Sequence, residues 1–160
     1  MARNILVVED DRNISELIRM YLEKEGFEVR LAYDGGKAVE EFDRQQPDMV
    51  LLDIKYTNNA DYQKYVGCSL NSVLQFLDYL QNVQIPALLR QVIIPTKNDS
   101  EQNILLLKEI AAAHPNVTAV ELLPFKKICQ VKYDKMGLVF PFGDLPVPDR
   151  QTMERLNILL

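Results

Sequence analysis

Short apolar runs that end in carboxylates constrain the fold of this chain more than any other feature. Residues 5–8, ILVV, lead into Glu9, Asp10 and Asp11, and residues 49–52, MVLL, lead into Asp53. Apolar runs of this length that stop at a polar loop are typical of buried parallel strands. Strands of this kind need crossover helices between them, so the pattern predicts an α/β fold.

Helical and strand-like segments alternate through the rest of the chain. Residues 14–22 carry apolar side chains at helical spacing, and Gly26 stands where a left-handed residue ends a helix. Asp34, Gly35 and Gly36 indicate a turn before a second helix that stops ahead of Pro47. Further strands are expected at residues 27–32, 88–95 and 117–123, and further helices at residues 62–66, at 70–81, from Ser100 and from residue 149 or 150 to the end. Residues 126–148 have no clear period.

Five strands separated by helices fit two architectures. The first is a single five-stranded, doubly wound (flavodoxin-like) parallel sheet in the order 2-1-3-4-5, with the terminal helix on the same face as the first helix. The alternative is a partial (β/α) barrel with every helix outside. Five strands are too few to close a parallel barrel, and an open sheet with one bare face would expose apolar side chains, so we favour the doubly wound sheet. Residues 1–160 are expected to form one domain.

Composition excludes several kinds of partner. The 160 residues carry a net charge of −5, and no run of lysine or arginine stands apart from acidic neighbours, so we expect no nucleic-acid partner. No apolar run approaches the length of a membrane span and the start resembles no signal-peptide core, so a soluble cytoplasmic protein without membrane contact is expected. Cys68 and Cys129 form no C-x-x-C motif and are expected to be reduced structural thiols.

The first 53 residues resemble a response-regulator receiver domain. The resemblance rests on the first strand with its acidic loop, NILVVEDD at residues 4–11, and on the third strand, PDMVLLD at residues 47–53. It implies that Glu9 and Asp10, with Asp53, hold Mg²⁺ and that Asp53 accepts a phosphoryl group. Oxygen ligands suit Mg²⁺, which neutralises charge on a transferring phosphoryl group.

A plainer interpretation of the same acidic residues is also open. Glu9 to Asp11 would then only cap the following helix, and Asp53 would be a loop carboxylate. If the three carboxylates Glu9, Asp10 and Asp53 do gather, repulsion should raise the pKa of at least one of them, and Asp53→Asn should stabilise the metal-free protein.

After Asp53 the chain resembles a second family, the pyruvate formate-lyase activating enzymes, which are radical S-adenosylmethionine proteins. The matching segments are LDIK at residues 52–55, YVG at 65–67, IPT at 94–96, ELLPF at 121–125 and TMER at 152–155. The resemblance covers residues 54–160 and implies that Asp53 and Lys55 lie beside the S-adenosylmethionine site. An ordinary solvated lysine is the alternative for Lys55.

The two resemblances meet at a strand that both families share, because both have an apolar strand ending Leu-Asp. A junction within residues 50–53 keeps the strand, its register and its terminal carboxylate. This placement favours an engineered chimera over a natural fusion.

The chain also lacks residues that the chemistry of each of these families needs. The activating enzymes hold a [4Fe–4S] cluster with cysteines at C-x-x-x-C-x-x-C spacing, which is absent here, so no Fe–S cluster and no radical chemistry are expected. The receiver lysine position holds Leu123, and only Thr96 fits the receiver Ser/Thr position. We therefore expect no enzyme activity, no required cofactor beyond a vestigial Mg²⁺ site, and loss of the original kinase and glycyl-radical enzyme partners.

Overall fold

The computed structural model describes residues 4–160, and the chain divides into two compact units. The N-terminal unit ends at Val50 and the C-terminal unit begins at Leu51. The division therefore falls at the start of the junction expected from the sequence, residues 50–53. That the two halves form one domain stays a prediction.

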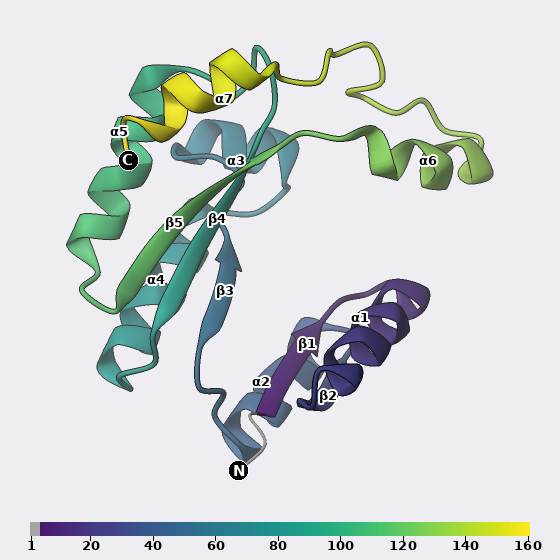
Figure 1. Ribbon diagram of the computed structural model, residues 1–160, viewed down its shortest axis with the longest axis vertical. Helices are drawn as coiled ribbons and strands as arrows, with labels where there is room; N and C mark the ends of the chain where they lie inside the picture. The colour runs from purple at the N-terminus through teal and green to yellow at the C-terminus, as the bar shows by residue number, and fades with distance from the viewer. Residues whose placement is uncertain (1–3) are drawn as a thin grey trace. The chain divides into compact units, whose positions relative to one another are not determined.

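Parallel sheets with crossover helices confirm the α/β fold class (Figure 1). The single five-stranded sheet is wrong, because the strands form a two-stranded sheet, β1-β2, and a three-stranded sheet, β3-β4-β5. Each observed neighbour pair agrees with the order 2-1-3-4-5, and the missing link is the one between β1 and β3. Apolar patterning specifies a strand and its buried faces, but it does not specify which edges pair.

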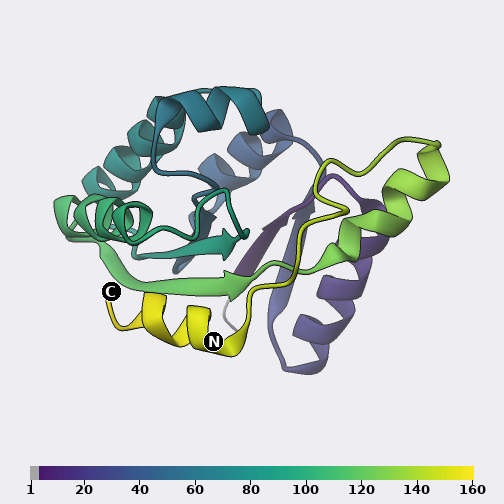
Figure 2. The same ribbon diagram turned by 90° about the horizontal axis from the view of Figure 1, so that it is seen from above.

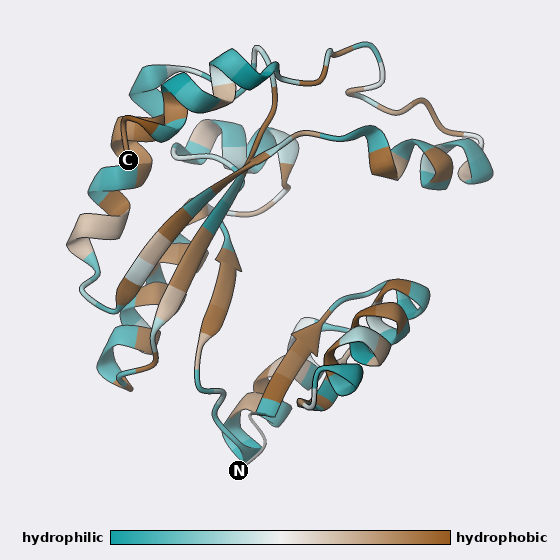
Figure 3. Ribbon diagram, in the orientation of Figure 1, coloured by the Kyte–Doolittle hydropathy of each residue, from teal (hydrophilic) through white to brown (hydrophobic). Residues whose placement is uncertain are grey.

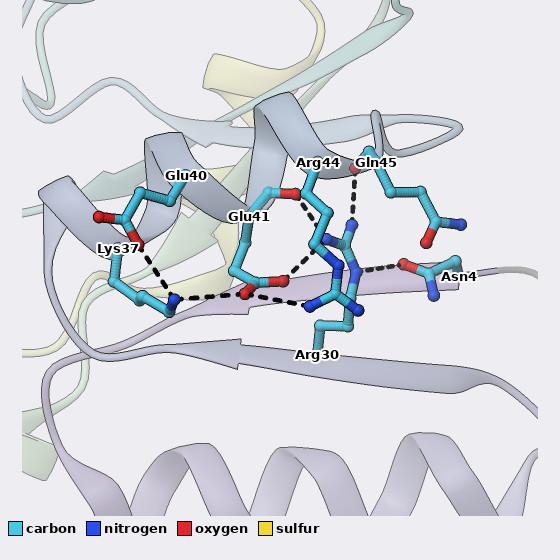
Figure 4. Close-up of polar contacts among 7 residues, drawn as sticks. All are labelled: Asn4, Arg30, Lys37, Glu40, Glu41, Arg44 and Gln45. Carbon is cyan, nitrogen blue, oxygen red and sulfur yellow. Dashed lines mark hydrogen bonds and ion pairs between the residues drawn. The ribbon is translucent and has the colours of Figure 1, made fainter.

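The N-terminal unit consists of two strands and two helices. These are β1 (Asn4–Val8), α1 (Arg12–Lys24), β2 (Glu28–Ala32) and α2 (Gly35–Arg44). The strands pair in parallel from Asn4 opposite Glu28 to Val8 opposite Ala32. Figure 4 shows α2 on one side of these strands and α1 on the other, which is the doubly wound arrangement on a small scale.

Capping side chains fix where both helices begin. The Asp11 carboxylate accepts hydrogen bonds from the backbone N–H groups of Asn13 and Ile14. Asp34 caps α2 through the N–H of Lys37 at 2.8 Å. The expected turn at Gly35 and Gly36 is therefore wrong: with Asp34 as the cap, both glycines lie in the first helical turn.

Arg30 joins three parts of the N-terminal unit (Figure 4). Its guanidinium group donates to Asn4 Oδ1 at 2.8 Å, to the carbonyl oxygen of Gln45 at 2.7 Å and to the Glu41 carboxylate at 3.1 Å. Burial opposes ionisation of Glu41, but the hydrogen bond from Arg30 and the charges of Arg44 and Lys37 hold its pKa below the ordinary value. The fully partnered guanidinium indicates a structural role.

The apolar stripe of α1 is only partly covered. Ile18 and Leu22 are half-buried, whereas Ile14, Leu17 and Tyr21 are exposed. All five were expected to form the inner face of this helix. The fully buried position of α1 is Ser15, which donates its hydroxyl to the carbonyl oxygen of Glu9.

The C-terminal unit holds the larger core. Its elements are β3 (Val50–Asp53), α3 (Asn59–Tyr65), α4 (Leu70–Asn82), β4 (Ala87–Ile93), α5 (Glu101–Ala113), β5 (Val117–Pro124), η1 (Lys127–Cys129), α6 (Gln130–Met136) and α7 (Arg150–Asn157). Alternate residues of β4 are buried, and Leu89 and Ile93 are fully enclosed with Leu77 of α4 and Leu107 of α5. Figure 3 shows the apolar residues gathered along these strands.

Helix α7 supplies the cover for the second face of this sheet. Figure 2 shows it on the side of β5 opposite α4 and α5, and Leu156 is fully buried there. Lys108 Nζ also donates to the carbonyl oxygen of Leu159 at 3.0 Å. The terminal helix thus covers a face of this sheet, and its expected position on the same face as the first helix stays a prediction.

Two short helices lie where the sequence has no period. Helices η1 and α6 follow β5, and α6 ends at Gly137, whose φ of 65° is left-handed. Neither helix has a buried residue, so neither needs the repeated apolar positions by which a helix is recognised in a sequence. Within residues 4–160 no helix is long and apolar enough to cross a membrane.

Candidate functional site

Asp53 lies at the carboxyl end of β3 between two cations. Its Oδ2 is 2.9 Å from Lys55 Nζ, and its Oδ1 accepts a hydrogen bond from Arg90 Nε at 3.1 Å. Arg90 comes from the neighbouring strand β4, so strand pairing and the D-x-K spacing together build this trio. All three side chains keep some solvent exposure, which makes the trio a polar site open at the edge of the sheet.

The backbone at Lys55 is held in place by buried polar side chains. Its N–H donates to the Tyr62 hydroxyl at 3.1 Å, and its carbonyl oxygen accepts from Asn98 Nδ2 at 3.1 Å. Asn98 also donates to the carbonyl oxygen of Val92 and accepts from the N–H of Ile94. The pKa of Tyr62 is raised, chiefly by burial, so the hydroxyl stays protonated. The loop after β3 is therefore rigidly tied to β4.

A second buried network supports the same loop. Thr57 donates its hydroxyl to Asn103 Oδ1 at 2.7 Å, and Asn103 Nδ2 donates to Gln91 Oε1 and to the carbonyl oxygen of Asn98, both at 2.7 Å. These side chains are nearly inaccessible to solvent. Hydrogen bonding satisfies most of these polar groups, which would otherwise be costly to bury, although Gln91 Nε2 has no partner within residues 4–160. The network fixes α5 against β3 and β4.

Thr96 and Leu123 hold the positions that a receiver gives to a hydroxyl and a lysine. Thr96 lies in the loop after β4 with a left-handed φ of 66°, and its N–H donates to Asp99 Oδ1 at 2.9 Å. Leu123 lies in β5 opposite Val92. A leucine side chain cannot contact phosphoryl oxygens through a charge, so the site has no receiver lysine at this strand end.

Glu9 and Asp10 follow β1 in the N-terminal unit. Glu9 Oε1 accepts the N–H of Asp11 at 3.1 Å, and Asp11 caps α1. The capping interpretation is thus confirmed for Asp11. Asp53 belongs to the C-terminal unit, so the Mg²⁺ site of Glu9, Asp10 and Asp53 stays a prediction. Within either unit, the described residues hold no group of three or more His, Cys, Asp and Glu side chains suited to a metal.

Sequence reasoning found Asp53 and Lys55 but missed Arg90, Asn98 and Asn103. Arg90 stands with Gln91 inside the otherwise apolar strand β4, and a charged residue within a buried strand was the available signal. The two asparagines resemble ordinary loop and helix residues in the sequence. Cys68 and Cys129 are both free and exposed.

Comparisons with known proteins match both parts of the chain. A sequence profile of the response regulator receiver domain matches residues 5–60. Over 124 residues the chain is 31% identical to a pyruvate formate-lyase-activating enzyme of Listeria monocytogenes, which involves 76% of this chain and 50% of that protein. The corresponding enzyme of Clostridium pasteurianum is 34% identical over 110 residues, covering 69% of this chain and 46% of that one.

The chain is thus similar to the receiver domain over residues 5–60 and to the activating enzymes over about three quarters of its length. Its receiver profile ends at residue 60, slightly beyond the junction expected at residues 50–53. The chain spans about half the length of the curated activating enzymes that it matches.

A solved structure supports the fold alone. The crystal structure of a domain of a pyruvate formate-lyase-activating enzyme from Bacteroides vulgatus matches with a TM-score of 0.62 at 16% identity, covering 100% of this chain and 93% of that one.

Proposed function

We propose that the chain is an engineered chimeric α/β scaffold without the complete activity of either parent family. One observation carries the proposal: the chain divides between Val50 and Leu51, within β3, and it matches both the receiver profile and the activating enzymes. A junction at a strand that both families share preserves local structure while separating each family's functional residues. Such a protein acts as a soluble cytoplasmic scaffold that needs no cofactor.

Radical chemistry is absent from the proposed function because its iron ligands are missing. A [4Fe–4S] cluster needs several cysteine thiolates close together, and the chain has only Cys68 and Cys129. We accordingly propose that the chain holds no Fe–S cluster and does not recognise a glycyl-radical enzyme.

Efficient phosphoryl transfer is also absent from the proposed function. The Asp53 carboxylate already pairs with Lys55 and Arg90, and Leu123 offers no charge to a phosphoryl group. A phosphodonor therefore meets a carboxylate whose charge two cations already neutralise. We propose that no kinase, nucleic acid or membrane is a partner of the chain.

Weak phosphoacceptor activity at Asp53 is a second candidate, which the position of Lys55 favours. Its ammonium nitrogen is 2.9 Å from Asp53 Oδ2 and could stabilise a phosphoryl group in place of the missing receiver lysine. Mg²⁺ would supply the remaining positive charge. Retention of S-adenosylmethionine beside Asp53 and Lys55, without radical chemistry, is a remoter candidate that rests on the family resemblance.

Intact-protein mass spectrometry after incubation with acetyl phosphate and Mg²⁺ tests the proposal. We expect no phosphoryl adduct above the level of the Asp53→Asn variant. A stoichiometric adduct that Asp53→Asn abolishes and Lys55→Gln reduces would establish the second candidate instead. Anaerobic reconstitution with iron and sulfide should give no stoichiometric [4Fe–4S] absorption, and a cluster that survives desalting would contradict the proposal.

A further inference from the structure

A cavity of about 290 Å³ opens in the C-terminal unit where β3 and β4 end. Residues from the ends of both strands, from α3 and from the loop after α6 line it: Lys55, Tyr56, Tyr65, Val66, Val92 and Phe142. The carboxyl ends of parallel strands are where α/β sheets place ligands. Its volume is at the lower end of ligand pockets, so it suits a small molecule.

Flat aromatic rings form much of the cavity wall. The rings of Tyr56 and Tyr65 stack at 5.2 Å with 27° between their planes, and Phe142 lies 6.0 Å from Tyr65. Val92 completes an apolar surface. Rings arranged in this way favour a planar aromatic ligand, because offset stacking gives binding energy beyond that from burying the ligand's apolar area.

Two ammonium groups lie near Tyr65, a residue that lines the cavity. The ammonium nitrogens of Lys64 and Lys97 lie 4.9 Å and 5.5 Å from the centre of the Tyr65 ring. A hydrogen bond from Lys64, with the charges of both lysines, holds the pKa of Tyr65 below its ordinary value. Neither lysine belongs to any of the ion pairs found in residues 4–160. Both ammonium groups contact Tyr65 without an acidic partner in these residues, so they offer positive charge to an anion bound beside that ring.

The Tyr56 hydroxyl is a further polar group without a partner. Tyr56 is 3% exposed, and its hydroxyl makes no hydrogen bond within residues 4–160. A buried hydroxyl without a partner is costly, and a ligand acceptor could remove that cost.

We propose that this cavity binds a small aromatic carboxylate, with its ring against Tyr65 and Phe142 and its carboxylate on Lys64 and Lys97. The apolar rings account for the aromatic part of the ligand and the two ammonium groups beside Tyr65 account for its charge. The inference is independent of the scaffold proposal, because it requires no activity of either parent family.

Ligand-observed NMR titration of the full chain with phenylacetate tests this site. Two matched probes separate the contributions: 2-phenylethanol keeps the ring without the charge, and inorganic phosphate keeps charge without the ring. We expect phenylacetate to bind more tightly than either probe. Lys97→Gln should weaken phenylacetate about tenfold, which corresponds to about 1.4 kcal/mol, and leave 2-phenylethanol unchanged. Lys132→Gln, an exposed lysine on α6, is the matched control and should change neither.

A cavity-filling variant gives an independent readout. Val92→Phe should abolish binding of both aromatic probes, and if this variant does not fold, the double variant Lys64→Gln, Lys97→Gln decides the matter through phenylacetate alone. Equal binding of phenylacetate to the parent and to Lys97→Gln would overturn the proposal. Displacement of phenylacetate by stoichiometric S-adenosylmethionine would also overturn it, since the cavity would then be an inherited cofactor site.

Discussion

Replacing Tyr56 with phenylalanine should stabilise the protein. The hydroxyl is enclosed and makes no hydrogen bond within residues 4–160, and an unpaired buried polar group costs about 1–3 kcal/mol. Phenylalanine keeps the ring that stacks on Tyr65 at 5.2 Å. Taking the lower end for an uncharged hydroxyl, we expect Tyr56→Phe to raise the free energy of unfolding by about 1 kcal/mol at pH 7.

The same variant should also change the alkaline pH dependence of stability. Burial, with smaller contributions from the charges of Tyr65 and Asp61, raises the pKa of Tyr56 from 10.0 to about 12. The unfolded chain therefore loses this proton first, so the stabilising contribution is complete below about pH 10 and is lost as pH rises toward 12. Two pKa units correspond to about 2–3 kcal/mol, so the advantage of Tyr56→Phe should widen to about 3–4 kcal/mol near pH 12.

Urea unfolding followed by far-UV circular dichroism at about pH 7, 9 and 12 measures both effects. Tyr62→Phe is the matched control, because its ring is equally buried but its hydroxyl accepts the N–H of Lys55. That control should lower the free energy of unfolding by about 1 kcal/mol at pH 7. If Tyr56→Phe is as destabilising as Tyr62→Phe at neutral pH, the Tyr56 hydroxyl has a partner and the reasoning fails.

Four other substitutions, one with a matched control, have expected effects on the free energy of unfolding, measured in the same urea assay. Asn103→Ala should lower it by about 3 kcal/mol, because buried donors and acceptors lose their partner; an effect below 1 kcal/mol would mean that water replaces the amide. Leu156→Ala should lower it by about 2–5 kcal/mol, whereas the exposed Ile158→Ala should change it by less than about 0.5 kcal/mol; equal effects would show that α7 does not cover the sheet. Arg30→Met should lower it by about 2–3 kcal/mol, because several acceptors lose a charged donor; a neutral result would refute the joining role. Asp53→Asn should lower the free energy of unfolding by up to about 1 kcal/mol, because the carboxylate loses two ion pairs. If the variant is instead more stable than the parent in EDTA, repulsion between carboxylates outweighs these pairs, as the sequence suggested.

The expected sign for Asp53→Asn is the reverse of the one derived from sequence. Sequence reasoning placed Asp53 among other carboxylates, and repulsion would make its neutralisation favourable. The structure places Lys55 and Arg90 on the same carboxylate, so neutralisation removes two attractions. Residue types along one strand could not show this, because the deciding partner comes from β4.

Local signals predicted the elements well where burial or capping decides them. Ser100 caps α5, Asp11 caps α1, and the strand predicted at residues 88–95 is β4 with alternate residues buried. Each of these features depends on residues within a few positions of one another. The pattern failed at Gly35, where a side-chain cap outweighs the turn preference of glycine, and at α6, which is too short for a period.

Tertiary features were less accessible because they depend on which strands pair. The Thr57–Asn103–Gln91 network joins residues that are 46 and 12 positions apart, and neither distance leaves a pattern in the sequence. The division into two sheets is of the same kind, since β1 and β3 each have the composition of an interior strand. Composition therefore predicts that a strand is buried, but not what buries it.

Asp53 shows how a residue can be common to two families while its chemistry is not. Its strand ends Leu-Asp, a feature on which both family resemblances rest, so this residue fits either resemblance equally well. The groups that contact it, Lys55 and Arg90, both belong to the C-terminal unit. Because a carboxylate acts through the charges around it, pairing with two cations makes Asp53 part of an ion-pair cluster of that unit. A junction at a shared strand can thus preserve the fold of that strand. The chemistry of its terminal carboxylate then depends on which residues the neighbouring strand supplies.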